Sequence, residues 1–597
     1  MRQLCRCGIL SLVVSVTLNL SLAAGADAPS AQEAAQTVDR LLLDSTAAEF
    51  SPVDDSAWLR RACLDLVGRP PGVAEITAFG LDPDPDKRVQ KVQELLNHPE
   101  YATNWSRYWR DAIFLRATNM RAPLVRTAFE EWMAENLAEN RSWDSVVTDL
   151  LTATGPVNDN GATALIFAHE GQPEEIAAEA SRLFLGIQIQ CANCHNHPWD
   201  KWKREQFHEF VAFFPRVSVR RDRSSDNMQD YEIASVNVDR SRNNGVSQFL
   251  LTRIDRNRDQ IISESEAKNT QLARIFSGQI KDTIDVNGDQ KLSIQEILTA
   301  RPPDANRPGQ GAVEHHMPNL ADPGSDGDLI HPAFFVGDAE VPKRLDDVSR
   351  RRTAADLITS ETNPWFARAV VNRLWSELTS AAFYAPIDDL GPDRPAEHHE
   401  VLEVLSNGFT QNGYDLKWLI TAITSTQFYQ RPVDTKAEGF ARLEPTRLRS
   451  DQFYNALCQT LNVTALPIPF TGRRGPYMRG ADPGRKEFAS TFEFDPSTPK
   501  SELTGSIPEA LFLMNSPQIH SFVRADSANS TIARISQQVI TDEDVVRELY
   551  LATVSREPWD SEVTICLDHV KGAASRSEGF EDLLWSLLNS SEYQSRQ

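Results

Sequence analysis

Apolar residues recur every three or four positions over most of residues 56–215, with polar residues between them. This spacing places the apolar side chains on one face of an α-helix, so this half of the chain is predicted to be helical. The same pattern returns after residue 350, where helices are expected at 366–378, 401–409, 416–426 and 545–554. We therefore predict a mainly α fold. The clearest examples of the spacing are Val89, Val92, Leu95 and Leu96, followed by Ile176, Ala180, Leu183, Phe184 and Ile187.

Two stretches interrupt the helical pattern and suggest domain boundaries. Residues 217–245 are polar and charged, as a linker or surface loop is, and residues 301–342 are rich in Pro, Gly and Asp, with short β-like pieces such as 333–336. The predicted organisation is an N-terminal helical domain at 27–218 and an inserted helical pair at 246–300. A connecting segment at 301–345 and a C-terminal helical domain at 346–597 complete the chain.

The first residues have the pattern of an export signal. Arg2 precedes an apolar run from Gly8 to Ala24, and small residues follow at 24–26. Together they predict a secretory signal peptide at 1–26, cleaved before Asp27; an uncleaved N-terminal anchor is the alternative. No later segment approaches the ~20 apolar residues of a membrane span. We therefore expect a protein exported to the periplasm, the cell envelope or the extracellular space, with no membrane span after signal removal.

Composition narrows the range of partners without identifying a reaction. The 597 residues include 61 Lys and Arg against 84 Asp and Glu, a net charge of −23. Nucleic acid and anionic membrane both need a basic surface, so neither is expected as a partner. Seven cysteines in so long a chain do not form a disulfide scaffold. The chain has no phosphate-binding glycine loop, nucleophile elbow or zinc-protease motif, so no catalytic residue is named.

Two twelve-residue segments, whose first residues are Asp255 and Asp285, carry oxygen ligands in the order that an EF-hand calcium loop requires. Carboxylates occupy positions 1 and 5, an amide position 3, a serine position 9 and a glutamate position 12. The backbone carbonyl at position 7 completes the set. The pattern predicts a paired EF-hand that binds calcium (Ca2+). The expected ligands are Asp255, Asn257, Asp259, Ile261, Ser263 and Glu266 in the first loop, and Asp285, Asn287, Asp289, Lys291, Ser293 and Glu296 in the second.

The residues at positions 8 and 6 of these loops predict how the loops pair and how tightly they bind calcium. Position 8 is apolar in both, Ile262 and Leu292, where paired loops form a short two-strand contact. Position 6 turns with positive φ and usually holds glycine; here it is Gln260 or Gln290, at a cost of roughly 1 kcal/mol each. We expect dissociation constants of ~10⁻⁴ to 10⁻³ M, with tighter binding in the second loop. A folded pair that no longer binds calcium is the alternative.

The segment Cys191-Ala192-Asn193-Cys194-His195 has the spacing at which c-type haem is attached. Cys191 and Cys194 would bond to the porphyrin and His195 would ligate the iron, and a helix at 174–190 is expected to lead into the motif. Alternatives are a local disulfide, a metal site that also uses His197 and His208, or a packed turn without a ligand. Candidates for the sixth iron ligand are His169, His197 and His208.

A further polar string runs from Asp388 to Glu400 and includes Asp389, Asp393, His398 and His399. Such residues could gather a metal ion or form an acid–base pair. The more ordinary interpretation is a loop followed by the charged start of a helix near residue 396.

Several of these segments together resemble a known family. Residues 59–71, 105–111, 184–190 and 191–198 are similar to the planctomycete cytochrome-associated domain of unknown function. In the second half, residues 351–358, 363–368, 371–375 and 415–417 resemble the usual C-terminal companion of that domain, also of unknown function. The predicted EF-hand pair lies as an insertion between the two. The companion pattern has glycines where this chain has residues 380–383, which is a departure from the family.

The resemblance implies export, because members are typically exported, and implies haem only by association with cytochrome-like domains. From the sequence we expect an exported calcium-binding protein of unknown activity that carries electrons through a haem at Cys191, Cys194 and His195. The alternative is an extracellular polymer-binding module or hydrolase in which Cys191 and Cys194 form a disulfide or bind a metal. Calcium ions are the expected partners, with envelope redox proteins or extracellular polymer as the others.

Overall fold

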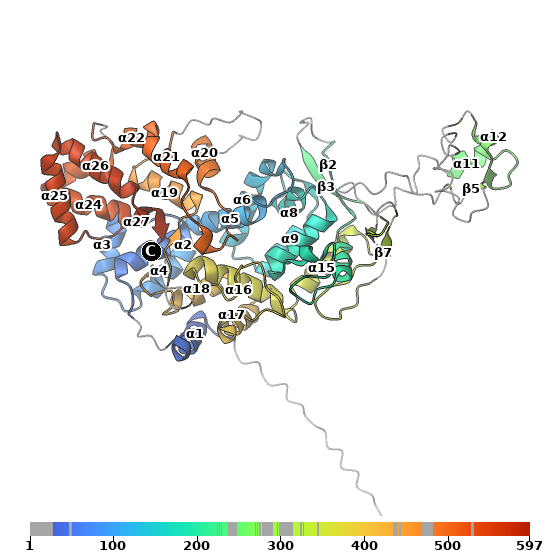
Figure 1. Ribbon diagram of the computed structural model, residues 1–597, viewed down its shortest axis with the longest axis horizontal. Coiled ribbons are helices and arrows are strands. Elements are labelled where there is room, and N and C mark those ends of the chain that lie inside the picture. Colours follow the sequence, from blue (N-terminus) through green and yellow to red (C-terminus); the bar gives the residue numbers. More distant parts are fainter. Residues whose placement is uncertain are drawn as a thin grey trace, which may run out of the picture.

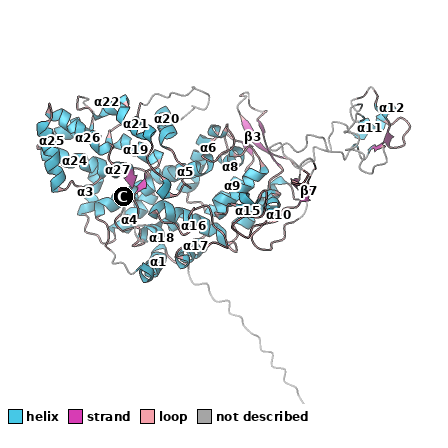
Figure 2. Ribbon diagram, in the orientation of Figure 1, coloured by secondary structure: helices cyan, strands magenta, loops and turns pink. Residues whose placement is uncertain are grey.

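The structure is a computed structural model of the 597-residue chain. It describes residues 28–46, 51–223, 225, 227, 230–236, 248–268, 270, 273, 276, 291–294, 297, 314–322, 325, 327–342, 345–433, 440, 443–467, 482–526 and 530–596. Helices dominate this part of the chain, as predicted, and the sheets are small (Figures 1 and 2). No helix in the described ranges is both long and apolar enough to cross a membrane.

Helices of the first half start and stop at residues whose chemistry explains their limits. The α2 helix begins where the Asp54 carboxylate accepts the Ala57 N–H, and it ends at Gly68, which has a φ of 72°. The helices are α1 (Ala31–Thr46), α2 (Asp55–Val67), α3 (Val73–Leu81), α4 (Lys87–Leu96), α5 (Pro99–Phe114), α6 (Arg126–Ala138), α7 (Trp143–Thr152), α8 (Ala164–Ala168), α9 (Pro173–Leu185) and α10 (Arg204–Val211), with 3₁₀ turns η1 (Ala122–Leu124), η2 (Gly161–Thr163) and η3 (Ile189–Ala192).

The four helices predicted in the second half are confirmed; three of them begin two or three residues earlier than predicted and one begins at the predicted residue. The helices of this half are α15 (Asp347–Ile358), α16 (Pro364–Thr379), α17 (His399–Gln411), α18 (Leu416–Ser425), α19 (Ser450–Thr460), α20 (Pro483–Phe492), α21 (Ile507–Asn515), α22 (Pro517–Val523), α23 (Thr531–Gln538), α24 (Asp542–Val554), α25 (Asp560–Gly572), α26 (Arg576–Leu588) and α27 (Ser591–Gln594), with the 3₁₀ turn η8 (Lys500–Glu502). The segment between the halves carries α11 (Gln248–Ile254) and α12 (Glu264–Ala267).

The strands are short and antiparallel. One sheet has the order β1 (Gly155–Pro156), β3 (Tyr231–Ser235), β2 (Val217–Arg221). Three two-stranded pairs join β4 (Ile261–Ile262) to β5 (Leu292–Ser293), β6 (His315–Met317) to β7 (Asp328–Ile330), and β8 (Thr446–Arg447) to β9 (Ser595–Arg596).

Two sequence expectations about irregular segments are wrong. Residues 217–221 and 231–235 form paired strands, where a linker or loop was expected, because Val217, Val219 and Ile233 supply a buried or half-buried apolar face. Residues 333–336 were expected to be β-like but form no strand. Phe334 and Phe335 are instead drawn into the core, where both rings contact Phe210 at centroid distances of 5.8 and 5.2 Å.

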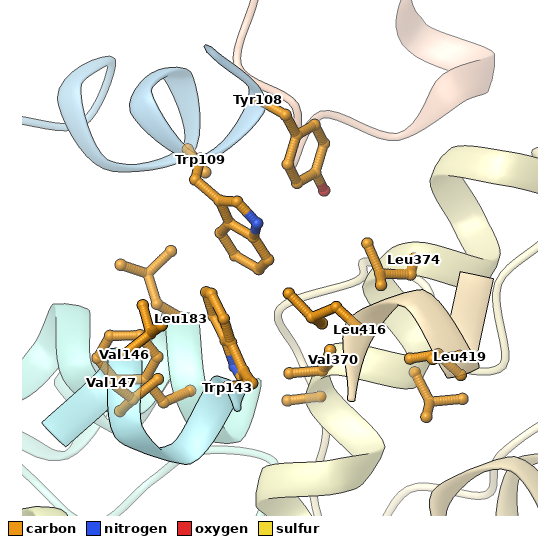
Figure 3. Packing of buried hydrophobic residues seen from close by; sticks show 14 of the residues in the cluster. Tyr108, Trp109, Trp143, Val146, Val147, Leu183, Val370, Leu374, Leu416 and Leu419 are labelled. Atoms are coloured by element: carbon orange, nitrogen blue, oxygen red, sulfur yellow. The ribbon is translucent and has the colours of Figure 1, made fainter. Parts of the chain in front are cut away.

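One hydrophobic core joins both halves of the chain. It runs from Ala31 to Leu443 and so includes helices on either side of the central segment. Trp109 of α5 and Trp143 of α7 stack with their ring centroids 4.3 Å apart. Figure 3 shows the two rings facing Val370 and Leu374 of α16. A second cluster contains Leu64 and residues from Leu448 to Tyr593. The packing therefore crosses the expected boundary between the N-terminal and C-terminal domains.

The central segment has a small core of its own. It consists of Leu251, Ile254, Ile262, Ala267, Leu292 and Ile297. Figure 1 labels α11, α12 and β5 in this unit.

Candidate functional site

The CxxCH segment lies on a turn that folds back from the end of α9. The expected helix at 174–190 is wrong at its C-terminal end, since α9 stops at Leu185 and Gly186 takes a φ of 67°. A Cβ on Gly186 would lie 2.8 Å from the side chain of Leu390, so this turn needs glycine for both its backbone and its packing. The η3 turn then delivers Cys191 to the surface.

Both thiols and the motif histidine are accessible. Cys191 and Cys194 are exposed and free, and His195 is exposed as well. The Nδ1 atom of His195 lies 2.7 Å from the carbonyl oxygen of Asn196. A carbonyl only accepts hydrogen bonds, so Nδ1 carries a proton, and in the neutral form of the ring the lone pair is on Nε2. This is the tautomer that a metal-ligating histidine needs.

Asn193, one of the two residues between the cysteines, is held by side chains of α10. The carbonyl oxygen of Asn193 accepts hydrogen bonds from His208 Nε2 and from Arg204 Nε, each at 3.1 Å. Arg204 also donates its backbone N–H to Asn196 Oδ1 and its guanidinium to the carbonyl of Pro318. The loop is thus tied to α10 and to Pro318, the residue that follows strand β6.

His208 is itself part of a buried histidine pair. Its Nδ1 lies 2.9 Å from Nε2 of His315 in β6, and the rings stack with an interplanar angle of 17°. Burial lowers the pKa of His208 to about 4 and that of His315 to about 3, so both are neutral at pH 7. On the far side, His315 Nδ1 lies 3.8 Å from Glu174.

The three histidines that are candidates for a sixth iron ligand differ in the hydrogen bonds that their ring nitrogens make. His208 has both ring nitrogens engaged, so it has no lone pair to offer. His169 is buried at the end of α8, with Nδ1 3.5 Å from Thr118 Oγ1. His197 stands two residues from His195, and its Nδ1 accepts the Trp199 N–H at 3.3 Å. Among the described residues, no group of three or more His, Cys, Asp or Glu side chains is placed to hold a metal ion.

The first predicted calcium loop is fully described. Asp255 accepts the backbone N–H groups of Asp259 and Gln260 at 3.3 and 2.9 Å, and Asp259 accepts that of Ile261. Gln260 has a φ of 62°, the left-handed turn expected at position 6, and Arg258 also has a positive φ. The antiparallel pairing of Ile262 with Leu292, predicted for position 8, is confirmed.

Glu266, the expected bidentate ligand, is engaged within the loop. Its carboxylate accepts the Ser263 hydroxyl at 2.6 Å, the Ser263 N–H at 3.0 Å and the Arg256 N–H at 3.0 Å. The Ser263 bonds lower its pKa to about 2. In the second loop, Lys291 and Ser293 are described, and Ser293 pairs with Ile261. The other expected ligands, Asp285, Asn287, Asp289 and Glu296, lie outside the described residues.

The polar segment at 388–400 connects helices of the two halves of the chain through ion pairs. Asp388 is buried between Arg182 of α9 and Arg373 of α16, both of which form ion pairs with it. Asp389 pairs with Arg394. The helix α17 begins at His399 and not at residue 396 as expected. The sequence analysis did not single out Arg182 and Arg373. Each is an arginine among apolar residues of a predicted helix, and this pattern could have indicated a buried ion pair.

This junction also touches the CxxCH loop. The N–H of Leu390 donates to the carbonyl of Gly186 at 2.8 Å. A Cβ on Gly391 would lie 1.7 Å from Asp200 Oδ2, so only glycine permits the close approach of the two loops. The surface around the cysteines is therefore assembled from both halves of the chain.

Fold and site together define a mainly helical protein with an exposed CxxCH loop held between two parts of the chain. Residues 33–219 match the family model described as PSCyt2, Protein of unknown function (DUF1549). Residues 350–462 match that of PSD1, Protein of unknown function (DUF1553). The two matches coincide with the pair of domains that the sequence resembles, and both families are of unknown function. No curated protein and no solved structure matches.

Proposed function

We propose that this is an exported protein that binds calcium through the paired loops at 255–266 and 285–296. The observation that carries the proposal is the antiparallel pairing of Ile262 with Leu292, in the register that an EF-hand pair requires. The hydrogen bonds from the N–H groups at positions 5 and 6 to Asp255 support it, because they fold the loop back onto its first predicted ligand. Glu266 would exchange its bonds to Ser263 and Arg256 for the ion.

Calorimetric titration of the mature chain with calcium chloride tests this proposal. We expect saturable binding with dissociation constants of ~10⁻⁴ to 10⁻³ M. Glu266→Gln removes one carboxylate oxygen at position 12 and weakens the first site. Glu264→Gln is the matched control, since Glu264 is exposed in the same helix but is not at a ligand position. Absence of saturable binding at 10 mM calcium, about tenfold above the expected range, contradicts the proposal.

We propose, as a second function, that Cys191 and Cys194 attach a c-type haem with His195 as an axial ligand. The exposed, free thiols and the Nε2 lone pair of His195 support this, because attachment requires access to the thiols and the iron requires an unprotonated nitrogen. A bound haem would supply one-electron transfer. The chain itself would orient His195 through Asn196 and hold the loop through His208 and Arg204.

A visible absorption spectrum of the protein, matured in a host that attaches c-type haem, tests the second function. A Soret band that survives denaturation and acid extraction is expected from the wild type. Cys191→Ser with Cys194→Ser should abolish it, whereas Cys458→Ala, at a buried cysteine of α19, should not. A colourless, fully matured wild-type protein refutes covalent haem and leaves the calcium proposal untouched.

A further inference from the structure

A pocket of about 490 Å³ lies between the start of α16, the start of α17 and the loop that joins them. Its walls include Trp365, Arg368, Tyr384, Arg394 and His399. Gly391 lines the same pocket and is the residue that packs against Asp200, in the loop that follows the CxxCH segment. The pocket therefore borders the junction between the two halves but contains none of the residues proposed to hold calcium or haem.

Two aromatic residues that line the pocket, Trp365 and Tyr384, have side-chain hydrogen-bond donors without a partner among the described residues. Tyr384 is only 7% exposed and Trp365 only 8%. Within the described residues, neither the Tyr384 hydroxyl nor the Trp365 indole N–H has a hydrogen-bond partner in the protein, while their backbone groups are bonded to Asn372 and Asn363. Both residues line the pocket, so these two donors are accessible from it and are available to a ligand or to water.

The two arginines add further donors to the same space. The Arg368 Nε–H donates a hydrogen bond to the Glu403 carboxylate at 2.6 Å, and the Arg368 guanidinium lies 5.2 Å from the centre of the Trp365 ring. Arg394 uses NH1 for Asp389. A guanidinium has five N–H donors, so each arginine keeps donors beyond its ion pair, whereas Glu403 and Asp389 have an arginine as partner.

The start of α17 reinforces this bias toward donors. The helix begins at His399, a pocket residue, and its N-cap His398 makes no side-chain capping bond. The first-turn N–H groups of a helix carry a partial positive charge that favours an anion. The arginines, the aromatic donors and this helix start all complement an acceptor-rich group.

We propose that this pocket binds a small oxyanion carried on a ring, such as the carboxylate, phosphate or sulfate group of an acidic sugar or an aromatic acid. The oxyanion lies against Arg368, Arg394 and the Tyr384 hydroxyl, because planar guanidinium forks match oxyanion geometry. The ring packs against Trp365, which provides an apolar face. This inference depends on neither calcium nor haem.

Calorimetric titration of the full chain with two matched ligand pairs tests the charge requirement. The pairs are galacturonate with galactose and benzoate with benzyl alcohol. We expect at least one acid to bind about tenfold more tightly than its neutral partner, as loss of a charged hydrogen-bond partner predicts. Equal affinities within both pairs, or no binding of any of the four ligands, overturns the proposal.

Two variants place the binding at this pocket. Tyr384→Phe removes a hydroxyl that bonds to no described residue, so it should lower affinity about tenfold while the melting temperature stays unchanged. Arg394→Gln should weaken binding at least as much. Arg352→Gln on the exposed face of α15 is the control for loss of one positive charge and should have no effect. Unchanged affinity in both Tyr384→Phe and Arg394→Gln overturns the assignment.

Discussion

Arg182 is a buried arginine whose guanidinium forms hydrogen bonds with four different residues. Its guanidinium donates to Glu179 on the same helix, to Asp388 at 2.6 Å, to the Ser497 hydroxyl at 3.0 Å and to the carbonyl of Ala112 at 2.8 Å. These partners come from both halves of the chain. Buried charges of this kind are tolerated because each is paired and hydrogen-bonded.

Arg182→Gln should destabilise the protein by about 3–5 kcal/mol, because Asp388 and Glu179 would remain buried with less compensation. Urea unfolding followed by circular dichroism measures the change. Arg352→Gln, whose ion pair with Asp356 is exposed, serves as the control and should cost no more than about 0.5 kcal/mol. Equal losses of unfolding free energy in the two variants would show that the buried hydrogen bonds of Arg182 contribute no more to stability than an exposed ion pair.

His208 should make stability fall as the pH drops below neutrality. Its pKa is about 4 in the fold, because of burial, against an unperturbed value near 6.5. Between these values the unfolded chain binds more protons, so the contribution of His208 is complete above pH 6.5 and is lost toward pH 4. The groups that face it are Asn193, His315, Arg204 and Glu205.

Unfolding free energies of the wild type and of His208→Gln at pH 7.0, 5.5 and 4.5 test this expectation. The wild type should be the more stable at pH 7.0, and the difference between the two should shrink as the pH falls. A difference that stays constant over this range would show that His208 does not titrate in the fold as its burial implies.

At the scale of elements, turn residues decide where helices and strands end. Ser380 ends α16 with a φ of 64°, and it is the first residue of the segment 380–383 at which the sequence departs from the glycines expected by resemblance. Its hydroxyl compensates by donating to the Thr379 carbonyl and accepting the Glu444 N–H at 2.9 Å. Gln260 has the same left-handed backbone in the first calcium loop, and its own backbone N–H donates to Asp255.

Gln260→Gly should therefore tighten calcium binding by up to about fivefold, which corresponds to the ~1 kcal/mol cost of a side chain at positive φ. The measurement is the calcium titration described above. Gln260→Ala is the control, because alanine keeps the Cβ that causes the strain. If glycine and alanine give the same affinity, the strain at Gln260 does not limit binding.

At the scale of the whole molecule, the two family domains share their interior. The core that runs from Ala31 to Leu443 includes α5, α7 and α9 of the first half together with α16 and α18 of the second (Figure 3). The final strand adds a further link, since Arg596 forms an ion pair with Asp65 of α2 at 2.7 Å. Neither half buries its apolar surface without the other.

A fragment of residues 27–218 should consequently fail to fold by itself. We expect no cooperative thermal transition in its circular dichroism, because the surface that α16 and α18 cover would be exposed to water. Co-expression with residues 346–597 should restore a cooperative transition. A cooperatively folded 27–218 fragment would show that the two domains are independent after all.

Much of the local structure was predictable from the sequence. The mainly helical fold, the helices that become α16, α17, α18 and α24, and the pairing of Ile262 with Leu292 all followed from the spacing of nearby residues. The errors were at ends and in irregular segments. The spacing predicts a helix up to residue 190, whereas α9 ends at Leu185, and it predicts a β-like piece at 333–336, where the phenylalanines pack into the core instead.

The sequence by itself determined the elements and the local motifs, because helices, turns and the CxxCH and calcium-loop spacings depend on residues close together in the chain. Only the tertiary structure decided which distant groups meet. Arg182 and Asp388 are 206 positions apart and His208 and His315 are 107 apart, and the pocket beside Tyr384 draws its walls from separate elements. Such pairings depend on how a shared core closes around buried charges and rings, and no spacing along the chain encodes that choice.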